Sequence, residues 1–369
     1  MTDSKPKLTP LAVQKAGLTR YGGLESLVAI SIAHLGHFFS VLVLHQLTLA
    51  IFPESSAVAA VTAALHIVSP AGLFLSAPYA ESTCALFSFL GCLLFTKSLS
   101  RTGESSIAKD ILVLISGILF GIATTFRTNA ILNGLLLLEE ALRVVSTLQN
   151  GLQYATFRRI AATGFGGLAV GFGFLLPQYL AYSEFCGNST AVKRTWCDSS
   201  LPSIYGFVQG YYWFAYQCQT RFFFANMNRN NGPFRYWTIS NIPLFLLATP
   251  MFFIMITSGI WGLNASVLTN TPEFSKQPST ETSGISATHP HSVQILRNLA
   301  VSQLALTAFT LITAHVQIIT RISSAYPVWV WYLAITRNKK DSITKGFVTF
   351  MVVYSVIQGG LFASFLPPA

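Results

Sequence analysis

The sequence predicts an all-α polytopic membrane protein. Hydrophobic residues make up 52% of its 369 positions and charged residues only 10%, whereas soluble domains carry about 25% charge. Long apolar runs alternate with short polar stretches, and about 20 consecutive apolar residues suffice to cross a bilayer as a helix. The net charge of +10 comes from basic residues scattered between these runs. That pattern is typical of topology signals and does not form the basic face that a nucleic-acid partner requires.

The apolar runs, taken in order, predict about nine or ten membrane segments. They cover residues 27–52, 57–74, 83–99, 111–132, 135–145, 160–181, 237–261, 296–320, 328–335 and 346–366. The run 135–145 is too short to span and is expected to be a broken or re-entrant piece, while 328–335 is a short aromatic run. The run 160–181 is rich in glycine, which permits close approach of two helices.

Polar stretches flank or interrupt one membrane domain, residues 27–369. Residues 1–26 form a polar N-terminal tail, 183–235 a long aromatic loop, and 262–291 a Ser/Thr/Pro-rich linker. The short basic loops fall on one side of the alternation, which the positive-inside rule makes the cytosol. The loop 183–235 is therefore expected in a lumen and the linker 262–291 in the cytosol.

The break between the second and third apolar runs contains an acidic residue. It reads SPAGLFLSAPYAES and includes Glu81, whose nearest basic residue in the sequence is Lys97. A carboxylate at membrane depth costs about 2.5–3.5 kcal/mol, so such a residue is usually functional. The alternative is that Glu81 caps the next helix at the membrane interface.

Two polar groups are candidates for binding a phosphate. Arg127 lies in TTFRTNAILNG at the expected lumenal end of a span, and its planar guanidinium can bind two phosphate oxygens; snorkelling to the interface is the alternative. His315, Gln317 and Arg321 lie in AHVQIITRISSAYP. Gln317 and Arg321 share a helix face there, which suits a lipid phosphate or a sugar hydroxyl, and plain packing polarity is the alternative.

The remaining candidates are cysteines and histidines. Cys186 and Cys197 flank the sequon at Asn188, so an oxidising lumen would favour a disulfide between them and a glycan on Asn188. His34, His37 and His45 share one helix face, but no cysteine or carboxylate joins them. We therefore expect these histidines to form hydrogen bonds between helices and not a metal site.

Several of these motifs together resemble the PIG-V family (GPI mannosyltransferase 2), of fungal type. They are the break with Glu81, the Arg127 stretch, PSIYGFVQ, FRYW, the His315 stretch and the terminal FLPPA, in the family's order over about residues 21–369. The resemblance implies a multi-span glycosyltransferase of the GT-C class in the endoplasmic-reticulum membrane. It also implies α-1,6 transfer of the second mannose from dolichol-phosphate-mannose to a GPI precursor on the lumenal side.

Within this resemblance the candidate residues take roles. Glu81 would position the acceptor or act as the base, while Arg127, Arg321, His315 and Gln317 would bind the donor phosphate. No cofactor is expected besides the lipid-linked donor, in keeping with a sequence that has no P-loop or Rossmann glycine pattern. The partners implied are the GPI-precursor glycolipid, dolichol-phosphate-mannose and a small membrane subunit.

The sequence departs from the family at two places. Family members begin with a further membrane helix and a lumenal loop that carries a Trp-Asp pair, so the chain looks truncated at its N-terminus, with residues 1–26 as a remnant of that loop. Residues 214–231 look like an insertion. Besides an active transferase, the alternatives are a catalytically inactive truncated family member and a polytopic transporter or assembly subunit.

Overall fold

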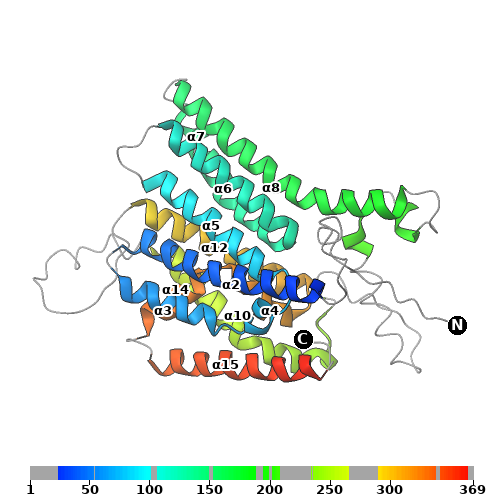
Figure 1. Cartoon of the computed structure of the whole chain (residues 1–369). Helices are drawn as coiled ribbons and strands as arrows, with labels where there is room; N and C mark the ends of the chain where they lie inside the picture. Colours follow the sequence, from blue (N-terminus) through cyan, green and yellow to red (C-terminus); the bar gives the residue numbers. More distant parts are fainter. Residues whose placement is uncertain are drawn as a thin grey trace, which may run out of the picture.

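The computed structural model describes residues 24–53, 55–100, 106–148, 153–187, 194–198, 202–207, 234, 236–265, 290–337 and 341–364. Within these residues the regular structure is helical (Figure 1). The α-helices are α2 (Leu24–Ile51), α3 (Ser56–Ile67), α4 (Gly72–Ser76), α5 (Glu81–Ser100), α6 (Ser106–Phe126), α7 (Gly134–Thr147), α8 (Tyr154–Cys186), α10 (Ile242–Leu263), α12 (Pro290–Thr313), α13 (Ile319–Ile322), α14 (Val328–Thr336) and α15 (Asp341–Ala363). Short 3-10 helices adjoin several of them: η2 (Thr128–Asn133), η4 (Thr195–Asp198), η5 (Ile239–Asn241), η7 (Val316–Ile318) and η8 (Ser323–Ala325).

Seven of the described helices are long and apolar enough to cross a membrane: α2, α5, α6, α8, α10, α12 and α15. The other predicted segments are the shorter helices α3, α7 and α14, of 12, 14 and 9 residues. Phe165, Leu168 and Phe172 on α8 are 61–69% exposed, as expected for side chains that face lipid. The chain is thus an all-α multi-pass membrane protein, as predicted.

Two of the predicted apolar runs are interrupted in the structure. The run 57–74 breaks because α3 ends at Ile67, shortly before Pro70, which disfavours helical geometry in the residue that precedes it. The run 296–320 breaks because α12 ends at Thr313, and η7, α13 and η8 follow one another from there to Ala325. Both interruptions lie beside candidate functional residues.

Glycines let α6 and α8 approach each other closely, as the run 160–181 predicted. A Cβ on Gly117 would lie 2.3 Å from the Cα of Gly166, and a Cβ on Gly173 would lie 2.1 Å from the carbonyl oxygen of Gly121. Both distances are far below van der Waals contact. The interface between α6 and α8 therefore requires glycine at these positions.

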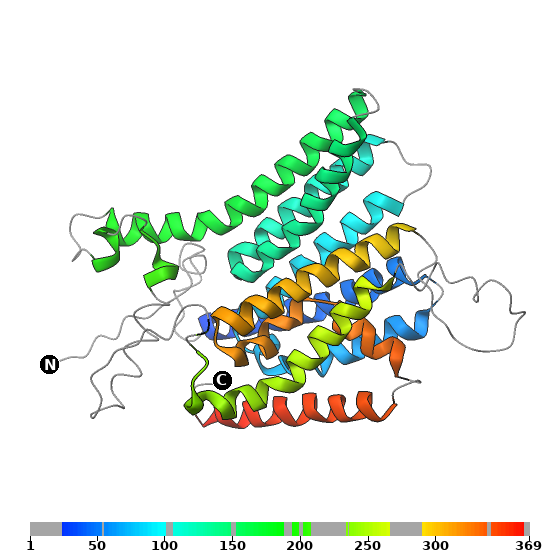
Figure 2. The same cartoon turned by 180° about the vertical axis from the view of Figure 1, so that it is seen from behind.

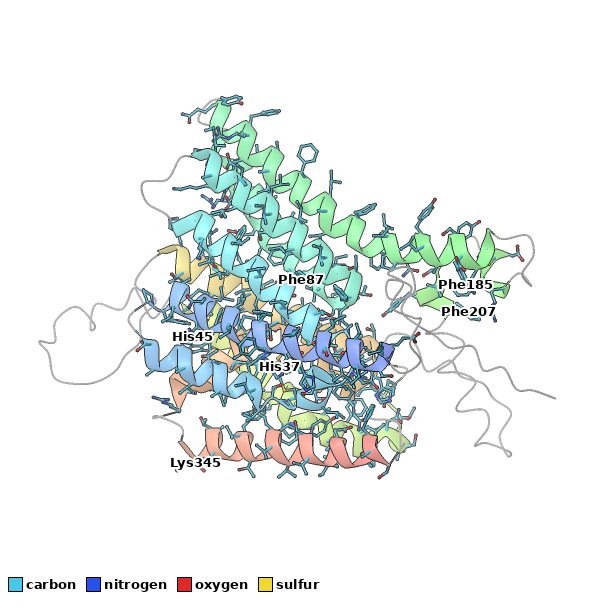
Figure 3. All side chains as sticks on the ribbon, viewed as in Figure 1. His37, His45, Phe87, Phe185, Phe207 and Lys345 are labelled. Carbon is cyan, nitrogen blue, oxygen red and sulfur yellow. A yellow bond between two sulfur atoms is a disulfide. The ribbon has the colours of Figure 1, made fainter. Side chains whose placement is uncertain are left out.

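The termini of the long helices gather at two ends of the bundle (Figures 1 and 2). Helices α2, α5 and α10 begin at one end, and α6, α8 and α12 finish there. We name this end the disulfide end, because Cys186, the last residue of α8, is bonded there to Cys197. Figure 3 places Phe185 at the disulfide end and Lys345 at the opposite end.

Ion pairs join α6, α7 and α8 at the opposite end. Glu140 is fully buried and accepts hydrogen bonds from Arg143 Nη2 at 2.6 Å and from Arg159 Nε at 2.8 Å. Asp110 accepts from Arg158 Nε at 2.5 Å and lies 3.4 Å from Arg159 Nη1. Arg158 and Arg159, two of the basic residues interpreted as topology signals, therefore also hold α8 to α6 and α7, while Arg143 pairs with Glu140 within α7.

Candidate functional site

Glu81 is the first residue of α5 and lies inside the bundle. Its side chain is only 2% exposed. The next residue, Ser82, packs on Gly36 of α2, whose Cβ position would be 3.3 Å from Ser82 Oγ. Gly36 is twelve residues after Leu24, the first residue of α2, and therefore about 18 Å along the helix axis. Glu81 therefore lies inside the bundle, and its functional role stays a prediction.

Two arginines meet at one oxygen of the Glu81 carboxylate. Arg127 Nη2 donates to Glu81 Oε1, and Arg321 donates to the same oxygen from Nε at 2.9 Å and from Nη2 at 2.7 Å. The arginines are 46 and 240 positions from Glu81 in the sequence. We name the three residues Glu81, Arg127 and Arg321 the Glu81 triad. It contains two positive charges and one negative charge.

Arg127 is positioned by the segment that follows α6. Its backbone is extended, with φ of −144°, and η2 begins at the next residue. Two hydrogen bonds fix η2: Tyr326 Oη donates to the Asn129 carbonyl at 2.9 Å, and Asn133 Nδ2 donates to Ser88 Oγ at 3.0 Å. The loop that carries Arg127 is therefore attached both to α5 and to the segment before α14.

Arg321 is positioned by aromatic rings from the same break that supplies Glu81. Its guanidinium carbon lies 3.9 Å from the ring centroid of Phe74 and 5.0 Å from that of Tyr79. Partly desolvated cation–π contacts of this kind contribute about 0.5–2 kcal/mol. The break at residues 69–82 thus provides both the carboxylate and the aromatic surface on which Arg321 rests.

His315 and Gln317 are the other two predicted phosphate-binding residues. His315 Nε2 lies 3.0 Å from Tyr236 Oη, and burial lowers the pKa of His315, so its neutral form is favoured. Gln317 is buried in η7, whereas Arg321 is in α13. Because η7 runs directly into α13, the expectation that Gln317 and Arg321 share one helix face stays a prediction.

A group of aromatic residues, which the sequence analysis did not single out as a site, holds the end of α12. Phe234 has a φ of 60°, an uncommon conformation for a bulky residue, and its N–H donates to the Ile312 carbonyl at 2.8 Å. Trp237 Nε1 donates to the Leu311 carbonyl at 3.0 Å. These carbonyls belong to the last turn of α12, where backbone acceptors lack partners within the helix. We name Phe234, Tyr236 and Trp237 the aromatic clip.

We expect Trp237→Phe to weaken the attachment of α12, because it keeps an aromatic ring but removes the donor to Leu311. Loss of such a hydrogen bond costs about 0.5–1.5 kcal/mol of unfolding free energy. A lower thermal midpoint of the purified chain would show this. Trp261→Phe is the matched control, since Trp261, on α10, packs edge-to-face on Tyr332 of α14 and away from the clip. Equal shifts for the two variants would contradict the clip.

The disulfide end carries the Cys186–Cys197 bond, with Cα atoms 5.6 Å apart. The glycosylation candidate Asn188, most of the N-terminal tail and the inserted-looking residues 214–231 lie outside the described residues, as does most of the linker 262–291. The histidines contact neighbouring groups: His66 Nε2 on α3 lies 3.2 Å from Ser40 Oγ on α2, and the rings of His37 and His66 are 5.5 Å apart.

Comparisons with known proteins agree with this architecture. The family model described as "Mannosyltransferase (PIG-V)" matches residues 16–369. The chain is similar to the GPI mannosyltransferase 2 of Gibberella zeae, with 38% identity over 98% of this chain and 79% of that protein. It is 41% identical to that of Chaetomium globosum over 94% and 71% of the two chains, and 36% identical to that of Aspergillus oryzae over 96% and 76%. No solved structure matches. The chain therefore belongs to the PIG-V family of mannosyltransferases and is a glycosyltransferase, as its motifs predicted.

Proposed function

We propose that this chain transfers the second mannose of a GPI anchor from dolichol-phosphate-mannose to the GPI precursor, in an α-1,6 link, in the lumen of the endoplasmic reticulum. Relatives named GPI mannosyltransferase 2 support the acceptor class. The helix that starts with Glu81, α5, begins at the disulfide end, and the disulfide there supports a lumenal site, because disulfides persist in oxidising compartments. The activated sugar arrives on its lipid, so the reaction needs no separate cofactor.

The convergence of Arg127 and Arg321 on Glu81 Oε1 carries this proposal. A guanidinium has five N–H donors, and the contacts with Glu81 use one nitrogen of Arg127 and two of Arg321. The salt bridges with Glu81 fix the orientation of both guanidinium groups. Their remaining N–H groups can then bind phosphate oxygens. The excess positive charge would stabilise the lipid phosphate as it leaves.

The bond changes follow from the two linkages. Mannose is β-linked in the donor and α-linked in the product, so a single displacement inverts C1. The acceptor hydroxyl oxygen bonds to C1 while the bond from C1 to the phosphate oxygen breaks, and the phosphate leaves with the electron pair. The hydroxyl proton passes to a base. Because both arginines engage Glu81, we assign Glu81 the role of positioning them and, through them, the donor.

Family membership favours an enzyme over a transporter or an assembly subunit. The experiment is an assay of microsomes from cells that lack their own second GPI mannosyltransferase and express this chain. Radiolabelled dolichol-phosphate-mannose and a GPI precursor with one mannose are the substrates. Formation of the two-mannose product, sensitive to α-1,6-mannosidase, is expected. An unchanged precursor, with the protein present and folded, would contradict the proposal and favour a catalytically inactive family member.

Arg127→Lys tests the phosphate role within the same assay. Lysine keeps the charge but loses the planar fork, and hydrogen bonds to charged groups contribute about 1.5–3 kcal/mol, so transfer should fall at least about tenfold. Arg297→Lys is the matched control, because Arg297 is exposed on α12. Normal transfer by Arg127→Ala would exclude Arg127 from donor binding.

A further inference from the structure

The second oxygen of the Glu81 carboxylate is buried and takes no part in the contacts with the two arginines. Glu81 Oε2 has no hydrogen-bond partner among the described residues, although Oε1 has two arginines. Buried polar atoms nearly always have a partner in protein or in ordered water, because an unpartnered one costs free energy. The same is true of three neighbours: Ser82 Oγ, His66 Nδ1 and His37 Nε2 are buried and without a partner in the described part of the chain.

These four atoms belong to residues grouped around one stretch of α2. Ser82 Oγ lies against Gly36, and Ser40, one turn further along α2, contacts His66. The ring of His37 lies 5.5 Å from that of His66. Gly36 and Ser40 are four residues apart on α2, about 6 Å along its axis, and His66 also packs edge-to-face on Phe89 of α5, with ring centroids 5.4 Å apart. We name the space between α2, α3 and the start of α5 the polar seam.

The hydrogen-bonding roles in the polar seam can be assigned. Ser40 Oγ donates its one proton to the His37 carbonyl at 2.7 Å, so it can only accept from His66 Nε2, 3.2 Å away. His66 therefore carries its proton on Nε2, and its Nδ1 is an acceptor. Glu81 Oε2 is also an acceptor. Both buried acceptors need donors, and water, which carries two donor protons, can supply them.

We propose that the polar seam binds structural water, which links His66 Nδ1 to Glu81 Oε2 by way of the Ser82 hydroxyl. The carboxylate is then held on both oxygens: by two arginines at Oε1 and by hydrogen-bonded water at Oε2. Ser82 and His66 are thereby positioning residues for the Glu81 triad. Water binding stands on the geometry alone, whereas the effect on catalysis rests on the proposed function.

Hydroxyl-radical labelling of the full chain in lipid nanodiscs, in oxygen-18 water, tests for the water directly. Radicals generated within the seam should oxidise His66, although its side chain is 0% exposed. Trp329 is the buried control, because it is equally inaccessible and its Nε1 donates to the Ser323 carbonyl at 3.0 Å; it should stay unlabelled. An unlabelled His66, in a chain whose partly exposed His45 is labelled, would overturn the water site.

Ser82→Ala tests the positioning role in the mannose-transfer assay. We expect kcat to fall about tenfold, equivalent to roughly 1.4 kcal/mol, with little change in the KM for the acceptor, and labelling of His66 to decrease. Thr96→Val is the matched control on α5, because the Thr96 hydroxyl bonds within its own helix, to the Cys92 carbonyl at 2.7 Å. If Ser82→Ala has a normal kcat and a raised thermal midpoint, the Ser82 hydroxyl has no hydrogen-bond partner in the folded protein. That result would overturn the positioning role of Ser82. Should the chain transfer no mannose at all, the labelling result would still decide the water site.

Discussion

Glu81→Ala should abolish detectable mannose transfer and also destabilise the protein. Without the carboxylate, the guanidiniums of Arg127 and Arg321 would face each other with no anion between them, and both are only 17–21% exposed. Removing one partner of a buried ion pair costs about 3–5 kcal/mol. Loss of one preorganised electrostatic group typically lowers kcat by about 10²–10³-fold. The thermal midpoint and the transfer assay measure the two effects separately.

A double variant distinguishes charge balance from donor binding. Arg321→Met, combined with Glu81→Ala, removes one charge of each sign and should recover part of the stability that Glu81→Ala loses. Transfer should stay low, because only one guanidinium remains for the phosphate. Glu184→Gln serves as the control, since Glu184 is exposed near the disulfide end of α8. Full activity in Glu81→Ala would contradict the assignment of the triad as the donor site.

Gly173→Val should prevent α8 from packing on α6. A Cβ at residue 173 would lie 2.1 Å from the Gly121 carbonyl oxygen, which is backbone and cannot rotate away. Overpacking costs about 1–3 kcal/mol where side chains can adjust, so the cost here should exceed that range. Because α6 ends beside Arg127, separation of the helices should also displace the Glu81 triad. Loss of the monodisperse peak in size-exclusion chromatography would report the failure.

Matched glycines on the same helix make this test specific. Gly167 and Gly171 have nothing within 4 Å of their Cβ positions, so Gly171→Val should leave the elution profile and the transfer rate near those of the unchanged chain. Similar damage from Gly171→Val and Gly173→Val would mean that α8 tolerates no β-branched residue for reasons of helix propensity, and would contradict the packing explanation.

The membrane fold was largely predictable because hydropathy is a local property. Each apolar run became a helix or the beginning of one, including the short runs at α7 and α14. The interruptions were harder to predict. Pro70 marks the end of α3, but nothing as plain separates α12 from η7, where the chain changes from α to 3-10 geometry within a run that reads as one helix.

The candidate site was predictable as a set of residues but not as an arrangement. The sequence drew attention to Glu81, Arg127 and Arg321 individually, whereas their meeting at one carboxylate oxygen depends on how helices 240 positions apart pack together. No periodicity records such a contact. The aromatic clip was hidden for the same reason, since Trp237 and Leu311 are 74 positions apart, and the role of Trp237 is to cap another helix.

The buried Glu140 on α7 constrains the order in which the chain can enter the bilayer during synthesis. Arg143 of the same helix can neutralise it at once, but its second partner, Arg159, is 19 positions later and belongs to α8. A translocon that released α7 alone would leave one side of this carboxylate facing lipid. The hairpin of α7 and α8 should therefore leave the translocon as a pair, and α7 of nascent chains arrested before Arg159 should still crosslink to the translocon.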